Sequence, residues 1–310
     1  MPWWQEVLRA CADILGSLFI QLVFTVGFFM LYGGFISLCN RYFYDACGER
    51  AFWLVRLTGY IGTPVHELSH ALMCLLFGHS VQKICLFGDS RDSKTLGYVE
   101  HTYYKSNLYH QIGNFFIGIS PILAGGAVIL LLIRFLTPGL FWDMRNETVS
   151  IGAAFAEGAL GEALLALFDG LFSIVVSLFS VKNLVDWRWW VCMLLVFPIA
   201  LHMEVSRSDI RSGVKGLAVI SALLFLTDVI LGWLFPDALL AVTEACVSAG
   251  IFMALFMMIP AVFSALIGLV SWIRVLTREA GRSIRNDVAP VTNCRTVHDH
   301  KKIEQKKKNR

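Results

Sequence analysis

The residues with the clearest chemical meaning are those of the motif HExxH, which runs from His66 to His70 inside an apolar stretch of the 310-residue chain. Positions i and i+4 lie on one face of a helix, so His66 and His70 can bind the same zinc ion. Glu67 stays free to accept a proton from a zinc-activated water molecule. The motif therefore predicts two zinc ligands and a general base, the set that metal-dependent hydrolysis requires.

A catalytic zinc ion has three protein ligands, so a third ligand must lie elsewhere in the chain. Met73 and Leu76 stand where the longer metzincin motif carries glycine and histidine, which excludes that class. His79 is half a helical turn out of phase with the motif, and Glu100 and His101 alternate to different faces of a predicted strand. His79 is therefore disfavoured, whereas Glu100 and His101 remain open as ligands.

Two further candidate ligands follow an apolar helix that is predicted to end near residue 201. His202 and Asp209 lie there at membrane depth, where ionisable residues are usually functional. Asp209 also fits a capping box with Ser206, a role that is compatible with metal binding. A buried histidine often only forms a hydrogen bond to a neighbour, so His202 is either a ligand or a residue that orients one. The pattern alone leaves Asp209 and His202 as rivals.

Composition indicates a multi-pass membrane protein. The chain is 56% hydrophobic and 16% charged, with a mean hydropathy of +0.64, whereas soluble domains are roughly 45–50% apolar and about 25% charged. The first apolar window begins too late and runs too long for a cleaved signal peptide, so we expect it to be a retained span. The six candidate spans are Ile14 to Leu38, Phe52 to Phe77, Ile112 to Leu136, Val191 to His202, Val214 to Phe235 and Leu239 to Val275.

Two regions depart from this pattern of simple spans. The region 151–181 is less regular and carries acidic residues, so we expect an amphipathic or re-entrant pair of helices. Two β-branched and aromatic runs flank a turn-forming segment within residues 81–104, which predicts a β-hairpin. The expected fold class is an all-α polytopic membrane protein with about six transmembrane helices, this helical pair, and a small β-hairpin after the HExxH helix. Residues 1–275 then form a single integral-membrane domain.

Residues 276–310 are expected to form a basic cytoplasmic tail. From Arg274 to the C-terminus the chain has eleven Lys and Arg against four acidic residues. The positive-inside rule therefore predicts a cytoplasmic C-terminus, and we expect an integral protein of the cell (inner) membrane whose surroundings are the lipid bilayer. No nucleic-acid partner is expected, because a solvated tail accounts for the basic run.

The eight cysteines form no CxxC pair and lie mostly in or beside the predicted spans, so we expect free thiols and no disulfide framework. Cys74 lies one helical turn beyond His70 and is therefore near the metal-binding face. Packing is the more common role for such a residue.

Over roughly residues 50 to 216 the chain resembles the site-2-protease-like (M50-type) intramembrane metalloproteases. The resemblance is carried by Val65 to Ala71, by the hairpin that follows, and by Ser208-Asp209-Ile210. Proteins of this family take a third zinc ligand from an aspartate in an LDG-type motif, so the resemblance implies that Asp209 binds the metal. The chain departs from the family at Ile210, where glycine is usual, in lacking the Asn/Pro-rich lead-in to the aspartate, and in having no room for a PDZ insertion.

The sequence thus predicts a Zn²⁺-dependent intramembrane endopeptidase that cleaves a membrane-anchored or membrane-adjacent protein or peptide, with Glu67 as general base. Such a role fits regulated intramembrane proteolysis. Asn114, at the entry to the third span, is a candidate donor to the developing oxyanion, although it can equally serve helix packing. The alternative is a non-hydrolytic metal-binding membrane scaffold or a transporter, although the chain shows no repeated halves. The oligomeric state stays open.

Overall fold

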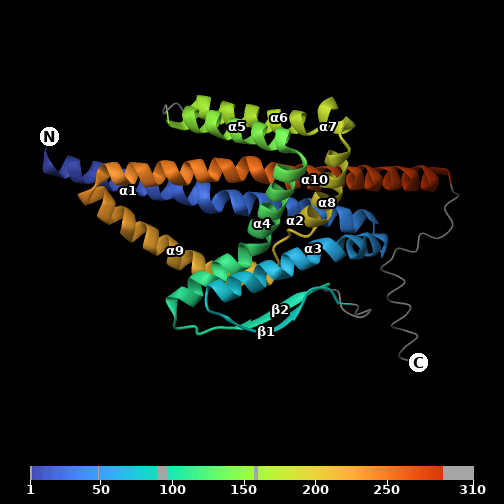
Figure 1. Ribbon diagram of the computed structural model, residues 1–310, viewed down its shortest axis with the longest axis horizontal. Coiled ribbons are helices and arrows are strands. Elements are labelled where there is room, and N and C mark those ends of the chain that lie inside the picture. The colour runs from blue at the N-terminus through green and yellow to red at the C-terminus, as the bar shows by residue number, and fades with distance from the viewer. Residues whose placement is uncertain (1, 48, 89–95, 157–159, 289–310) are drawn as a thin grey trace.

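The computed structural model describes residues 2–47, 49–88, 96–156 and 160–288, and most of these residues are helical (Figure 1). The helices are α1 (Trp3–Leu22), a π-helical turn (Val23–Gly27), α2 (Phe28–Cys47), α3 (Glu49–Leu76), α4 (Leu108–Leu136), α5 (Pro138–Ala156), α6 (Leu160–Leu178), α7 (Val181–Val185), α8 (Trp187–Leu201), α9 (Arg207–Leu234) and α10 (Pro236–Val288). Two strands, β1 (Ser80–Cys85) and β2 (Tyr98–Thr102), lie between α3 and α4. The expected all-α polytopic class with a small hairpin is confirmed.

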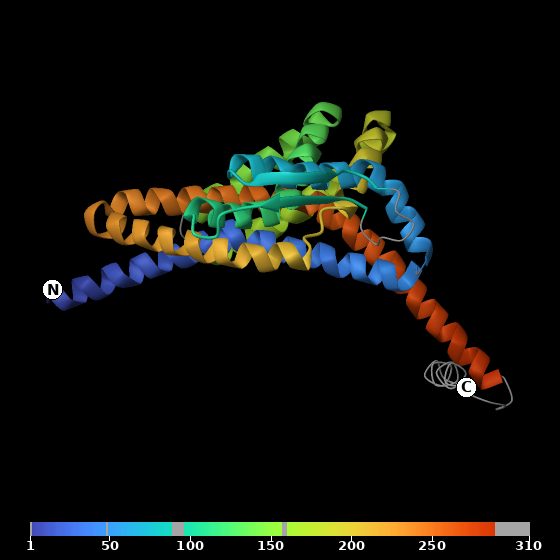
Figure 2. The same ribbon diagram turned by 90° about the horizontal axis from the view of Figure 1, so that it is seen from below.

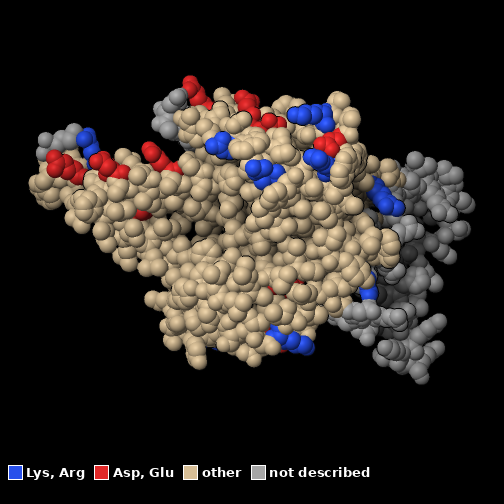
Figure 3. Space-filling model, viewed as in Figure 1, with Lys and Arg blue, Asp and Glu red and all other residues tan. Residues whose placement is uncertain are grey.

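Within the part of the chain that the structure describes, five helical stretches are long and apolar enough to cross a membrane, namely Trp3–Phe43, Leu108–Leu136, Leu164–Val185, Ser208–Leu234 and Pro236–Thr277. Figure 3 shows the matching surface: on this face the charged side chains gather along the margins, and the broad middle carries few. These apolar helices indicate an integral membrane protein.

The set of spans differs from the expected six in three places. The window over α3 falls short of the required hydropathy because His66, Glu67 and His70 interrupt it. Helix α8 has 15 residues, which is about 22 Å of helix against about 30 Å of hydrocarbon. Leu164–Val185, in the region expected to be an amphipathic or re-entrant pair, is apolar enough to be a span. Helix α6 of that region does pack side by side with another helix, but its partner α5 begins at Pro138, before the predicted region.

Helix α10 continues through Val288, so the first part of the expected tail 276–310 is helical. The remainder, residues 289–310, lies outside the described residues.

The hairpin lies along α3 (Figures 1 and 2). The strands pair antiparallel from Ser80 opposite Thr102 to Cys85 opposite Tyr98, with an irregularity between Val81 and Lys83. These positions confirm the hairpin expected over residues 81–104, whose turn residues 89–95 lie outside the described ones. Among the described residues the sheet has two strands, so each strand keeps one edge to which no described strand pairs.

A Schellman motif turns the chain from α3 into β1. Gly78 has a φ of 70°, in the left-handed region that glycine adopts without a steric penalty. The amide of Gly78 donates to the carbonyl of Leu75 over 3.3 Å, and the amide of His79 donates to the carbonyl of Cys74 over 2.8 Å. These two hydrogen bonds satisfy the last carbonyls of α3 and fix the direction in which the hairpin leaves it.

Helix α4 is the central element, because it packs against α3, α8 and α9. Its contact with α9 is close: a Cβ atom on Gly216 would meet the carbonyl oxygen of Gln111 and lie 2.9 Å from the Cβ of Phe115. Only glycine allows the two backbones to approach in this way. Because α9 begins with the segment that carries Asp209, this contact also sets the position of that residue.

We predict that Gly216→Ala destabilises the fold by about 1–3 kcal/mol, the usual cost of overpacking, because the added methyl group has no space against α4. Gly152→Ala is the matched control, since nothing lies within 4 Å of a Cβ atom at Gly152. Its gain in helix propensity should leave stability unchanged or slightly higher. The apparent unfolding temperature of each variant in detergent gives the comparison, and equal temperatures would contradict the packing argument.

Candidate metal centre and active site

The two histidines of the motif point their Nε2 atoms at each other. Both come from α3, and the Nε2 atoms of His66 and His70 lie 3.2 Å apart. Two ligands of a tetrahedral zinc ion with bonds of about 2.05 Å stand about 3.3 Å apart, so the imidazoles already have the spacing of a zinc pair. The i, i+4 geometry expected from the sequence is therefore present.

Backbone carbonyls from other helices set the tautomer of both rings. The Nδ1 of His66 donates to the carbonyl of His202 over 2.7 Å, and the Nδ1 of His70 donates to the carbonyl of Ile117 over 2.8 Å. A carbonyl oxygen only accepts, so each Nδ1 carries the proton and each Nε2 keeps its lone pair free. This is the arrangement that orients metal-binding histidines in proteins.

Asp209 lies beside this pair, in the first turn of α9. Its Oδ2 is 3.9 Å from the Nε2 of His70. The same carboxylate closes the capping box expected from the sequence: Oδ2 accepts from the amide of Ser206 over 3.1 Å and contacts the Ser206 hydroxyl, while the amide of Asp209 donates to that hydroxyl oxygen over 3.2 Å. Gly118 of α4 allows this close approach, because a Cβ atom there would lie 2.8 Å from the Asp209 carbonyl oxygen.

The ring of His202 is turned toward other partners. Its Nδ1 lies 2.9 Å from the carbonyl oxygen of Pro198, and the ring packs so tightly on Gly62 of α3 that a Cβ atom there would lie 2.5 Å from Nδ1. The residue serves the site through its backbone carbonyl, which holds His66. Of the two candidate third ligands, Asp209 thus has its side chain next to His70, whereas His202 contacts the motif through its main-chain carbonyl.

Glu204 fixes the connection between α8 and α9 that carries these groups. Its Oε1 accepts from the hydroxyl of Ser37 over 2.7 Å, and its Oε2 accepts from the amide of Asn40 over 3.3 Å. Asn40 also donates to the carbonyl of Leu201. Helix α2 therefore anchors the segment from which the His202 carbonyl and Asp209 reach the histidines.

Glu67 is 7% exposed and borders a cavity of about 740 Å³. The cavity is lined by residues of α2, α3, the approach to β2 and the α8–α9 connection, among them Arg41, Thr63, His66, Leu96 and Gly97. Gly97 packs on the Glu67 side chain, since a Cβ atom there would lie 2.7 Å from the Glu67 Cγ. A carboxylate, a candidate metal ligand and an open space for another molecule therefore meet in one place.

Two serines near the metal pair escaped the sequence analysis. The hydroxyl of Ser120 donates to the Ile117 carbonyl over 2.7 Å and lies 3.2 Å from the Nδ1 of His70. Ser69 lies 3.1 Å from Ser120 and donates to the carbonyl of His66. Both residues are fully or almost fully buried. The sequence does carry a signal for Ser120, because it is a hydroxyl residue directly before Pro121 in the middle of an apolar span.

The remaining sequence candidates take other places. Asn114 is buried in α4 one turn before Ile117, so the helix that carries it also orients His70. Glu100 is exposed on β2 and pairs in register with Lys83. His79 and His101 contact each other, with their Nδ1 atoms 3.1 Å apart.

Burial governs the protonation of this last pair. Desolvation lowers the pKa of His79. Desolvation also lowers the pKa of His101, the neighbouring His79 lowers it further, and the carboxylate of Asp209 raises it. His101 therefore lies within electrostatic reach of the candidate zinc ligand Asp209.

Comparison with known proteins agrees with this geometry. Residues 48–136, which include α3, the hairpin and α4, match the family described as Peptidase M50B-like. The search of curated proteins and the search of solved structures gave no match. Over residues 48–136 the chain is thus similar to the Peptidase M50B-like family.

Proposed function

We propose that this protein is a zinc-dependent intramembrane endopeptidase. The observation that carries the proposal is the convergence of two imidazole Nε2 atoms 3.2 Å apart, with a carboxylate oxygen 3.9 Å from one of them. The family match over the same helix supports it. Three donors of this type, with space for a water molecule, make up the usual ligand set of a hydrolytic zinc ion.

In this proposal His66, His70 and Asp209 hold the zinc ion. The histidines fit because their protonated Nδ1 atoms are bound by carbonyls, which leaves Nε2 as the ligand atom. Asp209 fits because its Oδ2 faces His70 while Ser206 holds the carboxylate in place. A zinc ion bound there supplies a water molecule of lowered pKa and polarises the carbonyl of the bond to be cut.

Glu67 handles the proton in the proposed reaction. It follows His66 on α3 and borders the cavity that would receive a substrate. Its carboxylate accepts the proton of the attacking water and then gives it to the amine that leaves. Asn114 remains a proposed donor to the oxyanion of the peptide carbonyl.

The hairpin gives a means of holding a substrate in extended form. Leu96 and Gly97 lead into β2 and line the cavity beside Glu67. No strand in the described ranges pairs with the outer edge of β2, so a substrate segment can pair with it through main-chain hydrogen bonds. Peptide bonds inside a helix are inaccessible to such pairing, so the substrate must unwind near the hairpin. We propose a membrane-anchored or membrane-adjacent protein as that substrate, with the C-terminus of the enzyme on the cytoplasmic side of the cell membrane.

The alternative of a metal-binding scaffold or transporter accounts for fewer features. A purely structural zinc site needs no carboxylate beside an open cavity, yet Glu67 lies at such a cavity. The two proposals make opposite predictions for a change at this residue.

We predict that Glu67→Gln abolishes proteolysis of a co-reconstituted membrane substrate, with a loss of about 10²- to 10⁴-fold, because the amide cannot accept the proton. Zinc content should equal that of the wild type, since Glu67 is not among the proposed ligands. The measurements are cleavage in liposomes and metal analysis of the same sample. Undiminished cleavage by the variant would rule out the general-base role.

We also predict that Asp209→Ala weakens zinc binding more than His202→Ala, because only Asp209 directs its side chain at the metal pair and alanine at position 202 keeps the carbonyl that holds His66. The expected increase in the dissociation constant for Asp209→Ala is at least about 10-fold, the lower end of what loss of a supporting group costs. Competition with a chelating dye measures it.

Ser206→Ala serves as the matched control for helix capping, because it removes the hydroxyl partner of the cap and leaves the carboxylate. It should weaken zinc binding less than Asp209→Ala. A larger effect of His202→Ala than of Asp209→Ala would reverse the ligand assignment.

A further inference from the structure

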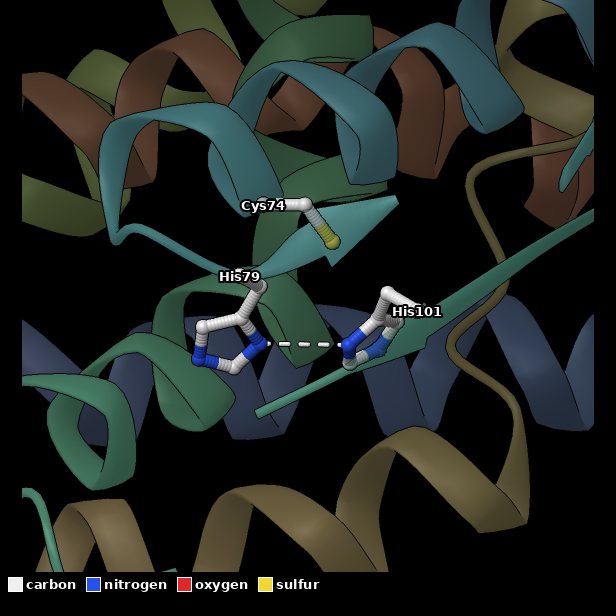
Figure 4. A group of neighbouring side chains, drawn as sticks. All are labelled: Cys74, His79 and His101. Carbon is white, nitrogen blue, oxygen red and sulfur yellow. Dashed lines mark hydrogen bonds between the residues drawn. The ribbon is translucent and has the colours of Figure 1, made fainter. Parts of the chain in front are cut away.

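Three potential metal ligands gather beside the candidate active site without belonging to it. The ligand atoms of Cys74, His79 and His101 all lie within 4.8 Å of one another. Figure 4 shows the thiol of Cys74 pointing from α3 toward the two imidazoles, with His101 on β2. We propose that these residues form a second binding site for a zinc-class divalent cation, independent of the proposed HExxH centre.

The fold brings the three residues together through the turn that ends α3. The amide of His79 donates to the carbonyl of Cys74 in the Schellman motif, so residues five apart in the chain become neighbours. The pairing of β1 with β2 then places His101 opposite Val81, close to the start of the hairpin. Each ligand therefore comes from a different element: α3, the turn and β2.

The hydrogen bonds of His79 prepare it as a ligand. Its Nε2 donates to the carbonyl of His110 over 3.0 Å, so the proton is on Nε2 and the lone pair is on Nδ1. That Nδ1 is the atom that faces His101. The ring is also held by stacking on Tyr103, with centroids 5.0 Å apart. A fixed tautomer bound by a backbone carbonyl is the same support that the HExxH histidines receive.

His110 acts in support and is not part of the ligand group. Its ring Nδ1 accepts from the amide of Tyr104 over 3.2 Å, and its carbonyl holds His79. The side chain is therefore committed to the segment that leads into α4. The ligand set is the one thiol and the two imidazoles of Cys74, His79 and His101.

The distances and the donor chemistry both suit zinc. The Nδ1 atoms of His79 and His101 lie 3.1 Å apart, close to the ~3.3 Å between two nitrogens on a tetrahedral zinc ion. A sulfur and a nitrogen on the same ion stand about 3.6 Å apart, within the 4.8 Å limit that contains the cluster. One thiolate with two imidazoles favours zinc over magnesium or calcium, which prefer oxygen.

Two members of the cluster are shielded from solvent. Cys74 is 0% exposed and His79 is 3% exposed. On binding, the thiol of Cys74 loses its proton to solvent, the thiolate sulfur forms a bond to the cation, and the two imidazoles bind through their lone pairs. The fourth position is open to water.

The proposed ion ties the hairpin to α3. Gly97, just before β2, packs on Glu67, so the position of β2 bears on the cavity beside the general base. A bond from Cys74 to His101 through a metal would hold β2 at a fixed distance from the helix that carries the HExxH motif. The second ion is therefore expected to order the edge strand that borders the cavity.

Metal analysis of the full-length chain in detergent tests the proposal. After zinc loading and removal of loosely bound metal, the wild type should hold two zinc ions per chain. Cys74→Ser and His101→Gln should each hold one, and the double variant His66→Ala/His70→Ala should also hold one. Cys39→Ser is the matched control, because Cys39 is another buried thiol and lies in α2; it should hold two.

Cobalt(II) substitution of the wild-type chain gives a second readout that needs no variant. A sulfur-to-cobalt charge-transfer band should appear in the spectrum, persist in His66→Ala/His70→Ala and in Cys39→Ser, and disappear in Cys74→Ser. Absence of this band from the wild type overturns the proposal, as does its loss in His66→Ala/His70→Ala, which would assign Cys74 to the HExxH centre. A chain that shows the band but lacks proteolysis in every assay would instead overturn the proposed function alone.

Discussion

The candidate centre depends on two hydrogen bonds from imidazoles to main-chain carbonyls. The carbonyl of His202, at the end of α8, holds His66, and the carbonyl of Ile117, within α4, holds His70. Without these acceptors the rings could rotate or protonate at Nε2, and the two lone pairs would no longer converge. Three helices must therefore pack in register before a metal can bind. The close glycine contacts of α4 serve this requirement, because they bring α9 and the Asp209 backbone against the helix that orients His70.

The polar residues that make α3 less apolar than its neighbours also explain how this helix is packed. His66, Glu67 and His70 would be costly in contact with lipid, so α3 packs against α4, α8 and the hairpin. Ser69 and Ser120 form a hydrogen bond between α3 and α4. Away from these polar groups, α3 and the surrounding helices present large exposed apolar side chains, as expected where lipid is the solvent.

The hairpin links the candidate centre to the cluster of Cys74, His79 and His101. The turn at Gly78 begins next to that cluster, and the residues that enter β2 pack on Glu67. Asp209 acts to raise the pKa of His101, so the two groups of proposed ligands lie in one region of the molecule. A short element between α3 and α4 thus contacts both places where a cation is proposed to bind.

The sequence by itself determined the parts of this protein that depend on local spacing. The i, i+4 histidines, the adjacent Glu67, the capping box of Ser206 and Asp209, the hairpin and most apolar helices follow from periodicity and residue type. The predicted set of spans included α3 and left out Leu164–Val185, whereas the hydropathy of α3 falls short of that of a span and Leu164–Val185 qualifies as one. Only the tertiary structure decided that Asp209 faces His70 while the His202 ring turns to Pro198, and that Cys74 meets His79 and His101. The physical reason is that side-chain direction in these cases is set by hydrogen bonds and close packing between helices far apart in the chain, which no local pattern encodes.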